Sequence, residues 1–146
     1  MNELVNQMKV VLASTFVFYL KAQNFHWNVE GPNFSEYHKL FGDIYEDASG
    51  SVDEVAERIR TLDHYAPGSL SRFAQLSVID DQINIPTARA MVQELQSDNV
   101  KIIAELNKAF DLADKANKQG LADYFAGRVD VHEKHGWQLR ATAKSQ

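Results

Sequence analysis

The sequence predicts an all-α fold, a bundle of four long helices in which a long crossover carrying a short helix joins helices two and three. Apolar residues recur at three- and four-residue spacing along most of the chain, which is the periodicity of amphipathic helices. The 7 glycines and 3 prolines fall at few places, so long stretches are free of helix breakers. A looser stretch at residues 65–86 separates two pairs of such segments.

The first helix is predicted at about residues 2–28, and the run Glu30-Gly31-Pro32 stops it. Its apolar side chains lie on one broad face, as expected of a helix packed against a core. That face consists of Leu4, Met8, Val11, Leu12, Phe16, Tyr19 and Leu20.

The second helix is predicted at about residues 33–62. Asn33 is placed to cap it, and Glu36 follows three residues later in the spacing of a capping box. Gly42 and Gly50 lie inside this helix, where each costs about 1 kcal/mol relative to alanine. Glycines retained at such a cost indicate close packing.

A turn at Pro67-Gly68 and a short helix from Ser69 or Ser71 to Leu76 are expected in the crossover. The third helix is predicted at 87–119, ending at Gly120, and the fourth at 121–144. Their inward residues are Met91, Leu95, Ile102, Leu106 and Phe110, then Phe125, Val129, His132, Gly136 and Leu139.

Two long helices, a crossover of about 20 residues and two more long helices make a bundle of ferritin-like connectivity, because the long link lets helices two and three run parallel. The rival topology is an up-down bundle with a disordered middle loop. The apolar motif LSRFAQL in the crossover argues against that rival.

At 146 residues and 45% hydrophobic, the chain is long enough for one compact domain, 1–146, with its own core. The absence of cysteine excludes disulfides, thiolate zinc sites and cysteine catalysis, and suits a reducing cytoplasm. The first residues lack a basic start and a long apolar run, so neither a signal peptide nor a membrane span is expected. A formal charge of −5 favours cations over polyanions as partners.

Two separate pairs of candidate metal ligands stand out. A bundle that holds two irons within one chain uses Glu-x-x-His, and none of the 5 histidines follows a glutamate at that spacing. Asp53 and Glu57 are four residues apart on one helix face and offer hard oxygen donors. His26 and His38 flank the turn after the first helix and are placed to face each other.

These two pairs cannot meet within one chain if the second helix is continuous. His38 and Glu57 are 19 residues apart, or about 28 Å along a helix. Either the pairs are unrelated, or a symmetry mate supplies the missing half so that metal binds between chains.

The residues at these positions resemble the signature of the Dps family, the ferritin-like DNA-binding proteins from starved cells. The resemblance covers nearly the whole chain. It rests on HWNVEGPNF at 26–34, His38, DEVAERI at 53–59, LAD at 121–123 and KHGWQLR at 134–140.

The resemblance implies a hollow homododecamer with ferroxidase sites at its dimer interfaces. Iron would be held by His26, His38, Asp53 and Glu57, while Trp27 would shield the iron and trap oxidising equivalents. It further implies that Fe(II) is oxidised with hydrogen peroxide and stored as a ferric mineral, which limits oxidative damage. Asp123 matches a position at which the family lines a pore with carboxylates.

The chain departs from the family pattern at two places. Gly42 stands where an Asp ligand to the second iron is usual, and Asp43 is rotated by about 100° on the helix. We therefore expect one strong iron position, held by His26, Asp53 and Glu57, and a weak one near His38. The termini also lack a lysine-rich tail, so DNA binding and nucleoid association are not expected.

Each of these residues has a structural alternative. Asp53 and Glu57 also fit a solvated helix face, and His26 and His38 fit capping or packing roles. Trp27 fits core or interface packing, and Asp123 fits a helix cap. His64 is expected in a loop, and His132 and His135 are expected to pack with Trp137. The residues that suit either a mineral-nucleating cavity or an ordinary charged face are Asp43, Glu46, Asp47 and Glu54.

Two alternative functions remain open at this point. One is a cage whose ferroxidase activity is weakened and whose main task is structural or DNA-protecting. The other is a monomeric four-helix protein that binds another small ligand.

Overall fold

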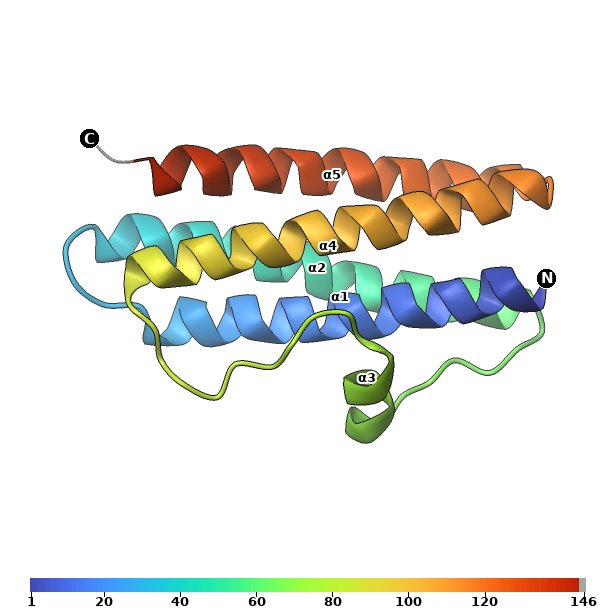
Figure 1. Ribbon diagram of the computed structural model, residues 1–146, viewed down its shortest axis with the longest axis horizontal. Coiled ribbons are helices and arrows are strands. Elements are labelled where there is room, and N and C mark those ends of the chain that lie inside the picture. Colours follow the sequence, from blue (N-terminus) through green and yellow to red (C-terminus); the bar gives the residue numbers. More distant parts are fainter. Residues whose placement is uncertain (145–146) are drawn as a thin grey trace.

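The computed structural model describes residues 1–144, which form five helices and no strands (Figure 1). The helices are α1 Asn2–Asn28, α2 Phe34–Thr61, α3 Leu70–Leu76, α4 Ala88–Lys115 and α5 Gln119–Ala143. The all-α prediction is confirmed, and so is the short helix in the crossover. None of the helices in the described part of the chain is both long enough and apolar enough to cross a membrane.

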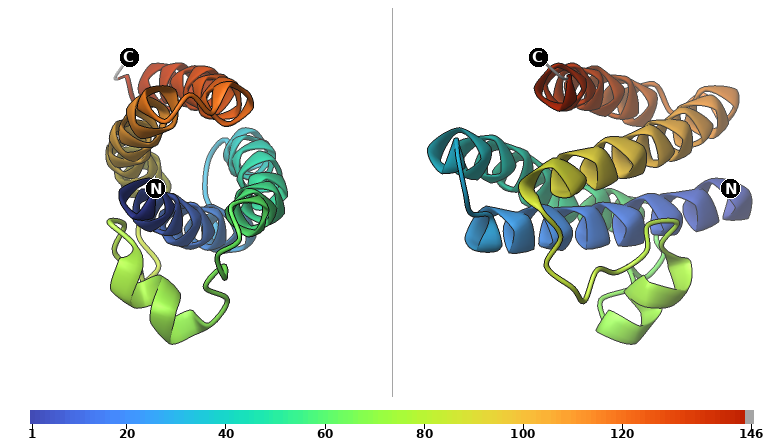
Figure 2. Two further views of the ribbon diagram at one scale, coloured as in Figure 1. Left: turned by 90° about the vertical axis from the view of Figure 1, so that its right-hand side faces the viewer. Right: turned by 60° about the vertical axis from the view of Figure 1, so that its left-hand side comes forward.

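The four long helices surround a common core, and the segment that carries α3 lies outside them (Figure 2). The chain turns sharply between α1 and α2, then crosses the bundle so that α4 runs parallel to α2 (Figure 1). The helix α1 packs against α2, α3 and α4, and α4 packs against α5. Within residues 1–144, α2 and α5 approach each other less closely than these pairs do.

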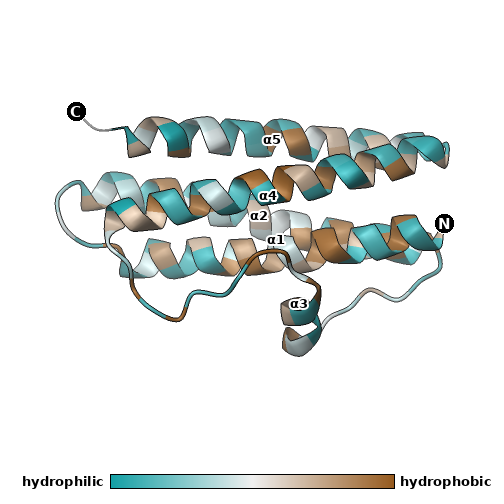
Figure 3. Cartoon of the chain, viewed as in Figure 1, coloured by the Kyte–Doolittle hydropathy of each residue, from teal (hydrophilic) through white to brown (hydrophobic). Residues whose placement is uncertain are grey.

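The core is built from the inward faces that the periodicity predicts. Teal and brown alternate along α4 and α5 in Figure 3, as expected of helices with one face in the core. Leu20 is 39% exposed, so its assignment to the inner face of α1 was wrong. The largest fully buried side chains include Phe18, Phe25, Phe41, Phe125, Leu12, Ile44, Met91, Leu95 and Ile102.

At the start of α2 and the end of α4 an asparagine adopts a left-handed backbone conformation, which the prediction did not include. Asn33 has φ 65°, and its side chain makes no capping hydrogen bond, because a capping side chain needs an extended backbone. The helix α4 ends at Lys115 because Asn117 adopts φ 58° and the Lys118 N–H donates to Ala113 O at 2.9 Å. Gly120 therefore lies in the first turn of α5.

Candidate metal half-sites

The first half-site is a pair of stacked histidines where α1 ends and α2 begins. His26 and His38 donate from Nδ1 to each other's backbone carbonyl oxygens, both at 2.7 Å. Their ring centroids are 3.7 Å apart and the ring planes differ by 17°. Because a carbonyl oxygen only accepts, each ring carries its hydrogen on Nδ1, which leaves the Nε2 lone pair available to a metal ion.

The stacked pair depends on the absence of a side chain at Gly42. A Cβ atom placed there would lie 3.0 Å from both Cε1 and Nδ1 of His26. The ring of His26 therefore rests against the backbone of α2. It also makes an edge-to-face contact with the ring of Tyr45, and the two ring centroids are 5.2 Å apart. Close packing at Gly42 is confirmed, whereas Gly50 is exposed with nothing within 4 Å of the corresponding position.

The second half-site is the exposed carboxylate pair Asp53 and Glu57 on α2. The pKa of Glu57 is raised, first by a hydrogen bond with Asp53, then by the charge of Asp53, with smaller effects of desolvation and Glu54. The neighbouring Glu54 pairs with Arg58 at 2.9 Å. None of the ion pairs found in residues 1–144 includes Asp53 or Glu57. A bound cation would relieve this crowding of negative charge.

The structure keeps the two half-sites apart within one chain. The helix α2 is continuous from Phe34 to Thr61, so His38 and Glu57 are separated by about 28 Å. Among the residues that the structure describes, no three His, Asp or Glu side chains are grouped to hold a metal ion. A complete four-ligand site would therefore need a second copy of the chain.

Several other candidate residues have partners within the subunit. Asp43 pairs with Lys39 at 2.9 Å, and Asp47 pairs with Arg128. Asp123 is exposed in α5, whose N-terminus has no side-chain cap, so the structure gives no support to its role as a helix cap. His64 Nδ1 donates to Leu62 O at 2.8 Å, within its own loop.

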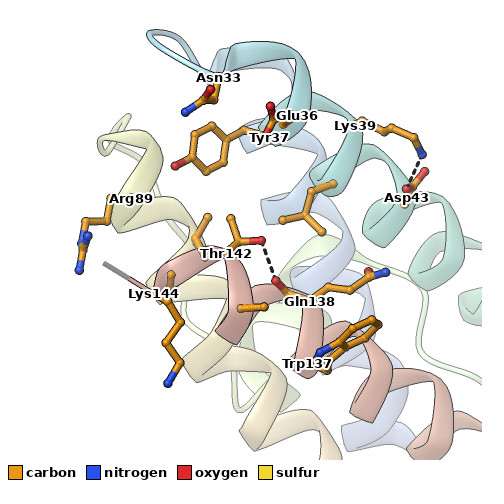
Figure 4. Close-up of a pocket in the computed structure, with 14 residues that line it drawn as sticks. Asn33, Glu36, Tyr37, Lys39, Asp43, Arg89, Trp137, Gln138, Thr142 and Lys144 are labelled. Carbon is orange, nitrogen blue, oxygen red and sulfur yellow. Dashed lines mark hydrogen bonds and ion pairs between the residues drawn. The ribbon is translucent and has the colours of Figure 1, made fainter. Parts of the chain in front are cut away.

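Trp27 and Trp137 are both largely exposed, at 62% and 56%. Trp27 follows His26 at the end of α1. Trp137 lines a cavity of ≈ 770 Å³ between the start of α2 and the end of α5 (Figure 4). The expectation that His132 and His135 pack with Trp137 was wrong, because both histidines point into the bundle and are buried.

A buried polar network at His132 was missed by the sequence analysis. Arg128 donates to both oxygens of Asp47 at 2.9 and 2.8 Å, and His135 Nε2 lies 2.8 Å from Asp47 Oδ2. Arg128 Nη2 lies 3.2 Å from His132 Nε2, and Asn99 holds the other side of that ring. The available signal was the placement of Arg128, His132 and His135 on one face of α5 at helical spacing.

This network predicts that the protein loses stability in mild acid. Burial, together with the charges of Arg128 and His135, lowers the pKa of His132 to about 3 against the weaker effect of Asp47. Because the unfolded chain binds a proton near pH 6.5, the free energy of unfolding should fall by about 1.4 kcal/mol per pH unit from pH 6.5 downwards. This contribution should level off near pH 3.

Unfolding midpoints measured between pH 7 and about pH 5, above the range of most carboxylates, test this prediction. His132→Gln should flatten the slope, while His64→Gln in the loop should keep it. An unchanged slope in His132→Gln would contradict the assignment.

Comparison with known proteins agrees with this architecture. The Ferritin family model, described as a ferritin-like domain, matches residues 5–145. The DNA protection during starvation protein of Brevibacillus brevis is 34% identical over 146 residues, covering 97% of this chain and 98% of the relative. The crystal structure of Dps from Staphylococcus aureus has a TM-score of 0.95 and 32% identity, covering 100% of this chain and 98% of that chain.

A further similar structure carries a description of its chemistry. The Dps protein from Vibrio cholerae O1, described as a member of a broad superfamily of ferritin-like diiron-carboxylate proteins, has a TM-score of 0.93 and 29% identity. The alignment covers 98% of this chain and 90% of that chain.

Proposed function

Because this chain belongs to the Dps family of ferritin-like proteins, we propose that it oxidises Fe(II) with hydrogen peroxide at sites shared between subunits. The ferric product would be stored inside a homododecameric shell, which protects the cytoplasm from oxidative damage. The observation that carries this proposal is the separation of two complementary half-sites along α2, one at its start, where His26 of α1 meets His38, and one near its end, at Asp53 and Glu57. Fe(II) is the substrate of the reaction, not a resident cofactor.

The two half-sites offer the ligands that iron prefers. His26 and His38 present imidazole nitrogens, and Asp53 and Glu57 present carboxylate oxygens. A two-fold axis between two chains would bring each histidine pair against the partner's carboxylate pair and so form two equivalent sites. The protein supplies fewer ligands than iron accepts, so coordination positions stay open for the oxidant.

An apolar groove beside Asp53 supports such a contact between subunits. The groove has a volume of ≈ 360 Å³ and is bordered by side chains of α1, α2 and α3, including Phe16, Tyr19 and Phe73. Trp27 is exposed next to the histidine half-site. A two-fold contact that unites the half-sites would place both apolar surfaces in the interface, where their burial stabilises the pair.

The reaction balances with the substrates named. Two Fe(II) ions each give one electron, the O–O bond of hydrogen peroxide breaks, and its oxygens are reduced to the level of water. Adding two water molecules gives two FeOOH and releases four protons. The hydrogen bond with Asp53 raises the pKa of Glu57, and an Fe(II) ion bound beside the two carboxyl groups would oppose that shift.

We further propose that Asp123 lines a pore for Fe(II). Its carboxylate is exposed in the first turns of α5, as an ion entrance requires. Rings of carboxylates raise the local concentration of cations and speed their entry.

The geometry at Gly42 predicts unequal iron binding. No carboxylate is present one turn after His38, and the ring of His26 occupies the space that a side chain would need. When Fe(II) is titrated anaerobically into the protein and binding is monitored by calorimetry, one iron per site should bind tightly. Any second iron should bind at least about 10-fold more weakly. Two equally tight irons per site would contradict this expectation.

We propose that the protein does not bind DNA at physiological salt. The chain carries a formal charge of −5, and residues 1–8 contain no Lys or Arg. Phosphate binding needs clustered basic residues and weakens steeply with salt. A gel shift with linear duplex DNA should show no complex at about 0.15 M salt. A complex that survives at that salt concentration would overturn the proposal.

A further inference from the structure

The proposed reaction needs two electrons for each hydrogen peroxide, and one Fe(II) gives only one. The iron position at His26 is expected to be the strong one, since Gly42 offers no carboxylate to a second iron. A site that holds a single Fe(II) when peroxide arrives is therefore one electron short. Breaking the O–O bond with one electron gives hydroxide and a hydroxyl radical, which attacks the protein. A second electron from an oxidisable side chain beside the iron prevents this damage.

Tyr45 is an oxidisable side chain in contact with the iron-binding ring. Its ring lies edge-on to the imidazole of His26, with 5.2 Å between the centroids and an interplanar angle of 65°. Aromatic rings at that separation are in direct contact. His26 Nδ1 donates to His38 O at 2.7 Å, which leaves Nε2 for iron. The imidazole of His26 thus joins the proposed iron position to Tyr45.

Within residues 1–144, the rings in contact with the two histidines include no second ring that is easily oxidised. Phe34 stacks on His38 with 5.1 Å between centroids, but a phenyl ring is far harder to oxidise than a phenol. Trp27 follows His26 in the sequence, yet it is 62% exposed and contacts neither imidazole ring. The geometry therefore favours Tyr45 as the source of the second electron.

Gly42 favours the contact between His26 and Tyr45 while it removes a ligand of the second iron. Gly42 and Tyr45 are three residues apart, so they share one face of α2. A Cβ at position 42 would lie 3.0 Å from both Cε1 and Nδ1 of His26, so a side chain there would displace the imidazole. The residue that leaves the site with one strong iron thus also lets His26 lie beside the tyrosine.

Oxidation of a tyrosine releases its phenolic proton, and the surroundings of Tyr45 allow this. Tyr45 is half-buried and packs against the core. Within the described residues its hydroxyl makes no hydrogen bond to protein, and the one buried side-chain polar atom without a partner is the hydroxyl of Tyr124. The hydroxyl of Tyr45 is therefore open to water, which accepts the proton.

We propose that Tyr45, acting through His26, donates the second electron when a site with one Fe(II) meets hydrogen peroxide. One Fe(II), one tyrosine, one hydrogen peroxide and one proton from solvent give Fe(III), a tyrosyl radical and two water molecules. The next Fe(II) to arrive returns the electron and, with another proton, restores the tyrosine, so two irons are still consumed per peroxide. This inference rests on the proposed function, because it concerns the handling of peroxide at the same site.

The test loads the assembled protein anaerobically with one Fe(II) per site, adds one equivalent of hydrogen peroxide, and freezes the sample for electron paramagnetic resonance. The wild type should show an organic radical whose spectrum narrows when the tyrosine rings are deuterated. Tyr45→Phe keeps the ring but removes the phenol, so it should lose most of this signal and release more hydroxyl radical to a spin trap.

Tyr37→Phe is the matched control. Tyr37 is half-buried on the same helix, but it stacks on Phe41 and does not contact His26. This variant should keep the wild-type radical signal and the wild-type release of hydroxyl radical. Tyr45→Phe should also bind the first Fe(II) as tightly as the wild type in an anaerobic titration. Weaker binding would assign Tyr45 a structural role and overturn the inference.

The rate of Fe(II) oxidation separates this inference from the proposed function. If the wild type oxidises Fe(II) with peroxide and Glu57→Ala does not, the shared site is supported. A tyrosine radical that is then absent, or that survives in Tyr45→Phe, overturns the role of Tyr45 and leaves the proposed function intact. A wild type that does not oxidise Fe(II) with peroxide overturns both.

Discussion

Replacing Glu57 with alanine is expected to lower the initial rate of peroxide-driven Fe(II) oxidation by at least about 100-fold. Mutating a residue that only hydrogen-bonds to a metal ligand already costs about 10- to 100-fold in metal affinity or activity, and Glu57 is proposed as a ligand itself. Glu57 and Asp53 supply all the negative charge of the carboxylate half-site. Without Glu57, Asp53 is the one negatively charged ligand left at the site, because the two imidazoles are neutral, and Fe(II) should bind much more weakly. The rate is measured by the absorbance of the ferric product after peroxide is added to protein preloaded with Fe(II).

Glu54→Ala is the matched control for this experiment. Glu54 is a neighbouring carboxylate on the same helix, but it pairs with Arg58 at 2.9 Å and is no part of the half-site. Its removal should change the oxidation rate less than about 2-fold, as for a surface ion pair. A wild-type rate no faster than that of Glu57→Ala would instead favour a mainly structural cage whose ferroxidase activity has weakened.

Helix position could be predicted from the sequence because it follows from the spacing of apolar residues. The bounds of α1 agree with the prediction, and those of α2 differ by one residue at each end. The largest error is at the end of α4, which stops at Lys115 because Asn117 adopts a left-handed backbone conformation, as Asn33 does before α2. Asparagine adopts the left-handed conformation less readily than glycine, so the residue type alone did not predict that conformation at these two positions.

The candidate half-sites could be predicted only as pairs of residues. Sequence spacing placed Asp53 and Glu57 on one face of a helix, and it placed His26 and His38 around one turn. The crossed hydrogen bonds that fix both imidazole tautomers depend on backbone carbonyl positions, which spacing does not define. The close contact of Gly42 with His26 likewise joins two helices and becomes visible only in the fold.

The network around Arg128 escaped prediction for a different reason. His132 lies on the apolar stripe of α5, where a buried neutral histidine is hard to distinguish from a packing residue. The members of the network outside α5 come from distant segments: Asp47 of α2 pairs with Arg128, and Asn99 of α4 pairs with His132, each more than 30 residues away in the sequence. Such pairs form only when the bundle brings distant segments together, so a single sequence gives no spacing rule for them.

Mixed cages of two inactive variants are expected to recover about one quarter of the wild-type activity if each site is shared across a two-fold axis. His26→Ala removes a histidine ligand, and Glu57→Ala removes a carboxylate ligand. A pair of chains that contains one of each has one site with both defects and one site with none. Random pairing in equal amounts makes half of the pairs mixed, and half of the sites in those pairs are intact.

The matched control mixes His26→Ala with His38→Ala. Both changes affect the histidine half, so every site in a mixed pair keeps one defect and activity should stay near that of the single variants. Native mass spectrometry of chains with distinct tags verifies that mixed assemblies have formed. Mixed cages of His26→Ala and Glu57→Ala that form but remain inactive would contradict a site shared between chains. Within a lone chain His38 and Glu57 lie about 28 Å apart along α2, so recovered activity could come only from sites that two chains complete together.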